Sequence, residues 1–113
     1  MEIADTQNLK QNKIKVLKGF RAYIGVMFKF LKEGEIYVLD TGREIEDIIH
    51  TFFCFNKIDI FLLNEKLEII DYYKNVPPFR IIIPKRKFRY VVEGLNLNEK
   101  IIREEVRSSL VRS

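Results

Sequence analysis

The feature that most constrains this chain is a series of short apolar runs separated by turn-forming residues. The runs are rich in Val, Ile, Phe and Tyr, which favour β-strands, and they are too short for independent helices. Gly, Pro, Asn and Asp stand between them and favour turns. We therefore predict about seven short strands. They cover residues 14–17, 36–39, 48–55, 58–63, 67–73, 79–83 and 88–93.

Two segments have a helical pattern instead. Over residues 20–28 the apolar side chains recur at the spacing of one helix face, which predicts a short helix. Near the C-terminus, Asn98 is a suitable N-cap, and Ile101, Ile102 and Val106 share one face of the helix that would follow it.

Together these patterns predict a mainly β fold at the border of the α+β class. The close spacing of the turn signals favours a single small antiparallel β-barrel or β-sandwich of about seven short strands with one or two short helices. The length of 113 residues is typical of one domain. We expect a loose N-terminal extension over residues 1–12 and a single domain over residues 13–113.

The composition is that of a soluble globular protein, with 47% hydrophobic and 32% charged residues. The first residues lack the features of a signal peptide, and no apolar run is long enough to span a membrane. The lone Cys54 cannot form an intramolecular disulfide. We therefore expect a cytoplasmic protein. Its many Ile and Lys residues are typical of an AT-rich or thermophilic, archaeal-like source.

A single Cys and a single His leave little room for metal or nucleophilic chemistry. A structural zinc site needs a set of ligands that these two residues cannot supply, and no calcium-loop pattern is present. We therefore predict no metal site and no cofactor. Cys54 lies between Phe53 and Phe55 without a neighbouring cation, so we expect a small core residue rather than a reactive thiol.

His50 and Asp59 are the two residues most able to form a site. Histidine is the residue type best suited to acid–base chemistry near neutral pH, so His50 is either a general base or ligand anchor, or a half-buried side chain bonded to a backbone carbonyl. Asp59 interrupts the apolar run 58–63, and burying an unpaired carboxylate is costly. It therefore either accepts backbone N–H groups and braces a loop, which we favour, or lines a pocket.

Residues 80–89 combine five cations with aromatic neighbours and contain no acidic residue. Such a mixture is typical of nucleic-acid surfaces. However, part of this segment follows Pro84 and lies between two predicted strands, where a solvated hairpin tip is expected. The candidate basic patch consists of Lys85, Arg86, Lys87 and Arg89, with Arg80 nearby.

Four segments, in this order, resemble the family called domain of unknown function 192. They are residues 20–28, 33–35, 50–62 and 76–80, and the spacing from His50 to Asp59 is their most specific part. The resemblance covers about residues 13–95. It implies a compact β-barrel-like or sandwich domain and brings no established activity. Cys54 stands where the family usually has Met, and Asn56 with Lys57 replaces an aromatic–Pro pair.

These observations lead to three functional hypotheses. The first is a small non-enzymatic binding or accessory domain with a pocket or surface near His50, Asp59 and Arg80, whose partner is a small ligand or a protein. The second is a small enzyme that uses His50 and Asp59 as an acid/base pair. The third is a weak nucleic-acid binder that uses the basic residues 80–89. Binding leads because the sequence contains no nucleophile–base pattern, phosphate loop or metal cluster.

Overall fold

The computed structural model describes residues 12–18, 31–51 and 55–112. Three of the expectations above concern residues outside these ranges. They are the N-terminal extension, apart from its last residue, the helix over residues 20–28 and the environment of Cys54.

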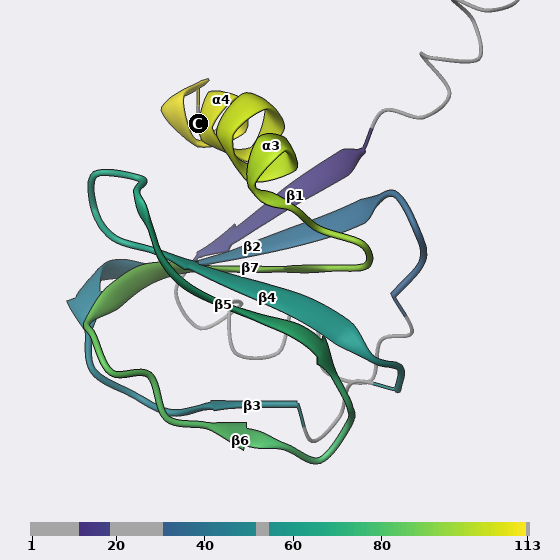
Figure 1. Ribbon diagram of the computed structural model, residues 1–113. Coiled ribbons are helices and arrows are strands. Elements are labelled where there is room, and N and C mark those ends of the chain that lie inside the picture. Colours follow the sequence, from purple (N-terminus) through teal and green to yellow (C-terminus); the bar gives the residue numbers. More distant parts are fainter. Residues whose placement is uncertain (1–11, 19–30, 52–54, 113) are drawn as a thin grey trace, which may run out of the picture.

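A five-stranded sheet forms the body of the fold (Figure 1). Its strands, in spatial order, are β1 (Lys13–Lys18), β2 (Glu35–Ile45), β7 (Phe88–Gly94), β4 (Ile58–Leu63) and β5 (Ile69–Val76). β1 pairs with β2 in parallel, and the other neighbours are antiparallel. Because β1 and β5 each pair on one side only, the sheet is open and not closed into a barrel.

A two-stranded ribbon packs against one face of this sheet. It consists of β3 (Ile49–His50) and β6 (Ile81–Ile82), which pair antiparallel, and we call it the β3–β6 ribbon. Ile49 belongs to the same hydrophobic cluster as Ile60 and Leu62 of β4, and Ile82 packs against that cluster. The ribbon lies below the sheet in the view of Figure 1.

The chain ends in a helix that covers the opposite face of the sheet, above it in Figure 1. It comprises α3 (Glu99–Ile101), the π-helical segment η1 (Ile102–Val106) and α4 (Arg107–Arg112), and we call it the C-terminal helix. The Asn98 side chain accepts a hydrogen bond of 2.9 Å from the N–H of Ile101, so the predicted cap is confirmed. No helix in the described ranges is long and apolar enough to cross a membrane.

Strand β4 explains why the fold has two hydrophobic clusters. All six of its residues are buried, because alternate side chains point to two covered faces of the sheet. Ile58, Ile60 and Leu62 join the cluster beneath the β3–β6 ribbon. Phe61 and Leu63 join the cluster beneath the C-terminal helix, which also holds the buried helix residues Ile102, Val106 and Leu110.

The mainly β class, the seven strands in the described ranges and the C-terminal helix are confirmed. Two expectations change in detail. Within the described residues, the strands in the runs 48–55 and 79–83 are limited to β3 and β6. Thr51, which follows β3, forms hydrogen bonds with the turn that precedes β6 instead of extending the two strands. The first strand is parallel, not antiparallel, to the second. The 16 residues between β1 and β2 (19–34) are long enough for the crossover that a parallel pair needs.

The buried face of the C-terminal helix generates a stability test. Val106→Ala removes two methyl groups from a fully buried site, whereas Val111→Ala makes the same change at a side chain that is 74% exposed. We expect Val106→Ala to lower the free energy of unfolding by about 2 kcal/mol and Val111→Ala to change it by less than about 0.5 kcal/mol. Chemical denaturation measures both. Equal effects would show that the helix does not pack on the sheet.

Candidate functional site

Asp59 is a buried carboxylate in strand β4, and each of its oxygens accepts hydrogen bonds. Oδ1 accepts from the backbone N–H of Asn75 at 2.8 Å. Oδ2 accepts from the backbone N–H of Leu97 at 3.0 Å and from Nζ of Lys74 at 2.8 Å. The side chain of Asp59 is therefore occupied by contacts within the protein.

These contacts connect three parts of the fold. Asn75 has a positive φ of 54°, and the register between β4 and β5 shifts beside it, so Asp59 holds the backbone of a β-bulge. Leu97 lies between β7 and the C-terminal helix, and Lys74 also donates to its carbonyl oxygen. This arrangement is the loop brace that the sequence favoured.

The structure does not bring His50 and Asp59 together. Asp59 alternates with Ile58 and Ile60 and bonds to Leu97, which places it on the sheet face beneath the C-terminal helix. His50 belongs to the β3–β6 ribbon, which packs on the other face. Because the sheet lies between these two residues, the geometry gives no support to an acid/base pair.

Thr51, which the sequence analysis did not single out, joins the His50 segment to the turn after β5. It is fully buried, and its N–H donates to the carbonyl oxygen of Arg80 at 2.9 Å. Its own carbonyl oxygen accepts from the N–H of Phe79 at 3.1 Å. The Thr51 hydroxyl donates to the Pro77 carbonyl oxygen at 2.8 Å and accepts from the Arg80 N–H at 3.0 Å. One threonine therefore connects the strand that contains His50 to the turn that ends at Arg80.

The outer face of the β3–β6 ribbon carries exposed isoleucines. His50 pairs with Ile81, Ile48 directly precedes β3 and Ile83 directly follows β6. These four residues alternate with the inward-facing Ile49 and Ile82. The side chains of Ile48, Ile81 and Ile83 are 51%, 55% and 76% exposed, and His50 is half-buried. The ribbon therefore presents an apolar surface to solvent.

Four cations border this surface. Arg80 directly precedes β6, and Lys85, Arg86 and Lys87 lie in the connection from β6 to β7. All four residues are exposed. We call the exposed isoleucines together with these cations the ribbon surface. It consists of Ile48, Ile81, Ile83, Arg80, Lys85, Arg86 and Lys87.

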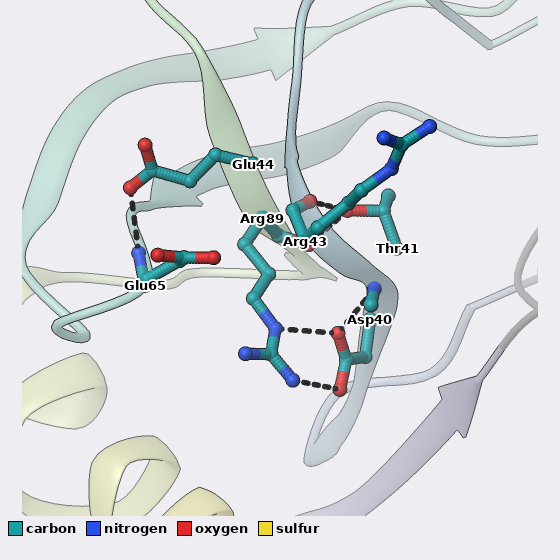
Figure 2. A network of polar contacts seen from close by, with 7 residues as sticks. Asp40, Thr41, Arg43, Glu44, Glu65 and Arg89 are labelled. Atoms are coloured by element: carbon teal, nitrogen blue, oxygen red, sulfur yellow. Dashed lines mark hydrogen bonds and ion pairs between the residues drawn. The ribbon is translucent and has the colours of Figure 1, made fainter.

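Arg89, the fifth predicted cation, is engaged elsewhere. Figure 2 shows its guanidinium facing the carboxylate of Asp40, with Nε 3.0 Å from Oδ1 and Nη2 3.4 Å from Oδ2. Asp40 also accepts from the N–H of Gly42 at 2.8 Å. Burial alone would raise the pKa of Asp40, but the hydrogen bonds and the charge of Arg89 outweigh it and lower that pKa. Arg89 therefore joins β2 to β7 and is not part of the ribbon surface.

Glu93 is a second buried carboxyl, and the sequence analysis did not single it out. It lies in β7 between Tyr37 of β2 and Ile60 of β4, and both neighbours belong to the cluster beneath the β3–β6 ribbon. Its carboxyl is buried, and Oε1 has no hydrogen-bond partner among the residues that the structure describes. Burial raises the pKa of Glu93 to about 7. The available signal was an acidic residue in an apolar strand, the same signal that identified Asp59.

The candidate residues of the sequence analysis do not gather at one place in the structure. Within the described residues, no three His, Cys, Asp or Glu side chains gather where they could hold a metal ion. Asp59 and Arg89 are held in structural contacts, and His50 lies across the sheet from Asp59. What the fold presents to solvent is the ribbon surface, where apolar and cationic side chains adjoin.

Comparison with known proteins places the chain among archaeal relatives. It is 29% identical over 96 residues to a UPF0127 protein of Pyrococcus horikoshii, and the match covers 83% of each chain. It is 32% identical over 74 residues to a UPF0127 protein of Pyrococcus furiosus, covering 66% of this chain and 63% of the relative. No model of a protein family matches the chain. The names of these relatives state no activity.

Two solved structures share the fold. One is from Sinorhizobium meliloti 1021 and is provisionally described as a transcription regulator; it has a TM-score of 0.67 and 15% identity, covering 74% of this chain and 68% of that one. The other, from Novosphingobium aromaticivorans, is described as a protein of unknown function. Its TM-score is 0.66 with 12% identity, covering 81% of this chain and 67% of that one. At these identities the likeness shows the fold alone.

The Asp59 contacts predict a large loss of stability on Asp59→Asn. An amide offers one acceptor oxygen, so one of the two backbone donors, on Asn75 or Leu97, would face an NH₂ group, and the ion pair with Lys74 is lost. We expect the free energy of unfolding to fall by about 3 kcal/mol. Asp71→Asn, in the less buried strand β5, serves as the control and should cost less than about 1 kcal/mol. Equal losses in the two variants would contradict the brace.

The raised pKa of Glu93 predicts that stability depends on pH. Folded Glu93 keeps its proton up to about pH 7, whereas the unfolded chain releases it near the usual value of 4.5. Stability should therefore fall as the pH rises from 4.5 to about 7, by roughly 3 kcal/mol in total. Glu93→Gln removes this fall and should be more stable than the wild type at about pH 8.

Denaturation midpoints across this pH range measure the effect. Glu46→Gln, an exposed carboxyl-to-amide control, should leave the pH profile of the wild type unchanged. Parallel profiles for the wild type and Glu93→Gln would show that Glu93 ionises normally in the folded protein.

Proposed function

We propose that this chain belongs to the family called domain of unknown function 192 and works as a non-enzymatic binding module. The order of the four resembling segments and the likeness to UPF0127 proteins support the family. Two of those segments meet in the structure, because Thr51 follows His50 and bonds to the turn over residues 77–80. In this proposal, residues 13–113 act as one domain.

The observation that carries the binding role is the ribbon surface. Ile81 and Ile83 are more than half exposed on one short segment, and exposed cations stand at both of its ends. Clustered exposed apolar side chains with a polar rim mark interaction sites on soluble proteins. The proposed binding residues are therefore His50 and Arg80, together with the isoleucines, whereas Asp59 supports the fold from the opposite face.

The alternatives receive less support from the same geometry. An acid/base pair of His50 and Asp59 would have to act across the sheet. In the nucleic-acid alternative, which uses residues 80–89, the guanidinium of Arg89 is already engaged in an ion pair with Asp40. Stacking on bases requires aromatic rings, but Phe88 and Tyr90 are buried, so Phe79 is the exposed aromatic side chain that this stretch retains beside its cations.

An anionic apolar dye, anilinonaphthalene sulfonate, tests whether this surface binds. We expect its fluorescence to rise with the folded wild-type chain and to lose at least about half of that increase in the double variant Ile81→Ser, Ile83→Ser. Val111→Ser is the matched control, because Val111 is 74% exposed and Ile83 is 76% exposed. The control should keep the wild-type signal.

Circular dichroism would show whether each variant keeps its fold. An unchanged signal in the folded double variant, or an equal loss in Val111→Ser, would overturn the ribbon surface as the binding surface. A single-stranded oligonucleotide titrated at low salt, where phosphate contacts are strongest, tests the nucleic-acid alternative. Tight binding that is lost on replacing Lys85, Arg86 and Lys87 with Gln would favour that alternative.

A further inference from the structure

We propose that the edge of β6 that faces away from β3, which pairs with no other strand within the described residues, binds an extended polypeptide segment as a third strand of the β3–β6 ribbon. We further propose that this segment is apolar at its centre and acidic at its ends. The inference rests on the proposed function and names the partner class. It is carried by three features of the described residues: the backbone register, the exposed side chains and the charges around β6.

The register shows which backbone groups of β6 face outward. The N–H of Thr51 donates to the carbonyl oxygen of Arg80, so this pair is hydrogen-bonded across the ribbon. Hydrogen-bonded and non-bonded pairs alternate along an antiparallel ladder. By this alternation the pair of Ile49 and Ile82 is bonded, and the backbone groups of Ile81 face away from β3. Ile83 directly follows β6, and the same alternation, continued by one residue, would turn its backbone groups outward as well. Ile81 in β6 and Ile83 directly after it would thus each offer a backbone N–H and C=O to another strand.

The same two residues offer an apolar contact. In a paired strand, residues directly opposite each other place their side chains on the same face. A segment with apolar residues opposite Ile81 and Ile83 would therefore cover the two isoleucines. Backbone pairing would supply affinity and the covered side chains would supply selectivity, as in other cases of strand addition.

The charges indicate the chemistry of the segment's ends. Arg80 stands before β6, and Lys85, Arg86 and Lys87 follow it after Pro84. Acidic residues on both sides of an apolar centre would complement these cations. Because Pro84 has no N–H, the edge ends there, and the paired stretch is limited to about three residues.

The two edges of the main sheet differ from β6. The edge strand β1 exposes Lys13, Lys15 and Lys18, and charged side chains of this kind discourage pairing with other strands. The other edge strand, β5, has a bulge and the charged residues Asp71 and Lys74. β6 contains no charged residue and no bulge, and cations flank it on both sides, so it is better suited to strand addition than these two edges.

A polypeptide fits this edge better than the other anionic partners. An anionic lipid surface would contact the isoleucines and the cations but would leave the outward N–H and C=O groups of Ile81 and Ile83 without a strand partner. A polypeptide satisfies the backbone, the apolar side chains and the cations together.

The test is an NMR titration of the ¹⁵N-labelled full chain with the synthetic peptide Asp-Glu-Ile-Thr-Ile-Glu-Asp. We expect the amide signals of Ile81 and Ile83 to shift the most. The same peptide with both Ile nitrogens methylated keeps its charges and side chains but lacks two backbone donors, and should bind at least about tenfold more weakly. A charge-reversed peptide, Lys-Arg-Ile-Thr-Ile-Arg-Lys, should also bind at least about tenfold more weakly.

Variants of the protein provide the second arm. Ile83→Ser should weaken binding of the acidic peptide, and Val111→Ser should not. Equal affinity for the methylated and unmethylated peptides would overturn strand addition, and so would peptide binding that moves the amides of β1 or β5 instead.

The outcomes separate this inference from the function on which it rests. If the dye binds the ribbon surface but none of the peptides binds, the polypeptide partner is wrong and the binding surface stands. Binding to vesicles of anionic phospholipid without binding to the acidic peptide would have the same meaning. If the dye signal also fails to depend on Ile81 and Ile83, the proposed function fails as well.

Discussion

The buried carboxylate of Asp59 is the interaction on which the rest of the structure depends. It sits in β4, the strand with both faces covered, and it accepts from the backbone of β5 and from the segment leading into the C-terminal helix. A carboxylate in this position is tolerated because both oxygens have donors and Lys74 compensates its charge. The bulge in β5 and the entry into the helix are therefore held by one side chain.

This arrangement divides the two faces of the sheet by role. The face beneath the C-terminal helix holds the Asp59 contacts and a closed hydrophobic cluster, so it contributes stability. The other face carries the buried Glu93 and is covered by the β3–β6 ribbon, whose outer side exposes isoleucines beside cations. Both faces of the sheet therefore bury a hydrophobic cluster, and the proposed binding surface lies on the outer side of the ribbon that covers one of them.

Much of the fold could be predicted because the hydrophobic pattern and the capping residues of short segments indicate its strands and its C-terminal helix. The run from Ile58 to Leu63 is a strand in the structure, and the helix begins after Asn98 as its capping side chain indicates. The site was predicted only in part. Thr51 was overlooked because its hydrogen bonds reach a turn about 26 to 29 residues away, and a threonine in an apolar run gives no local sign of them. Arg89 looked like a surface cation until Asp40 was placed beside it.

The sequence by itself determined the mainly β class, the capped C-terminal helix and the need for Asp59 to have partners. These features follow from properties of short sequence segments: side-chain periodicity, backbone preference and the cost of burying a charge. Only the tertiary structure decided that His50 and Asp59 lie on opposite faces and that Thr51 bonds to the turn that ends at Arg80. It also decided that Glu93 is buried with an oxygen that has no partner within the described part of the chain. Those outcomes depend on which strands become neighbours, and strand order is set by packing across the whole chain rather than by any one segment.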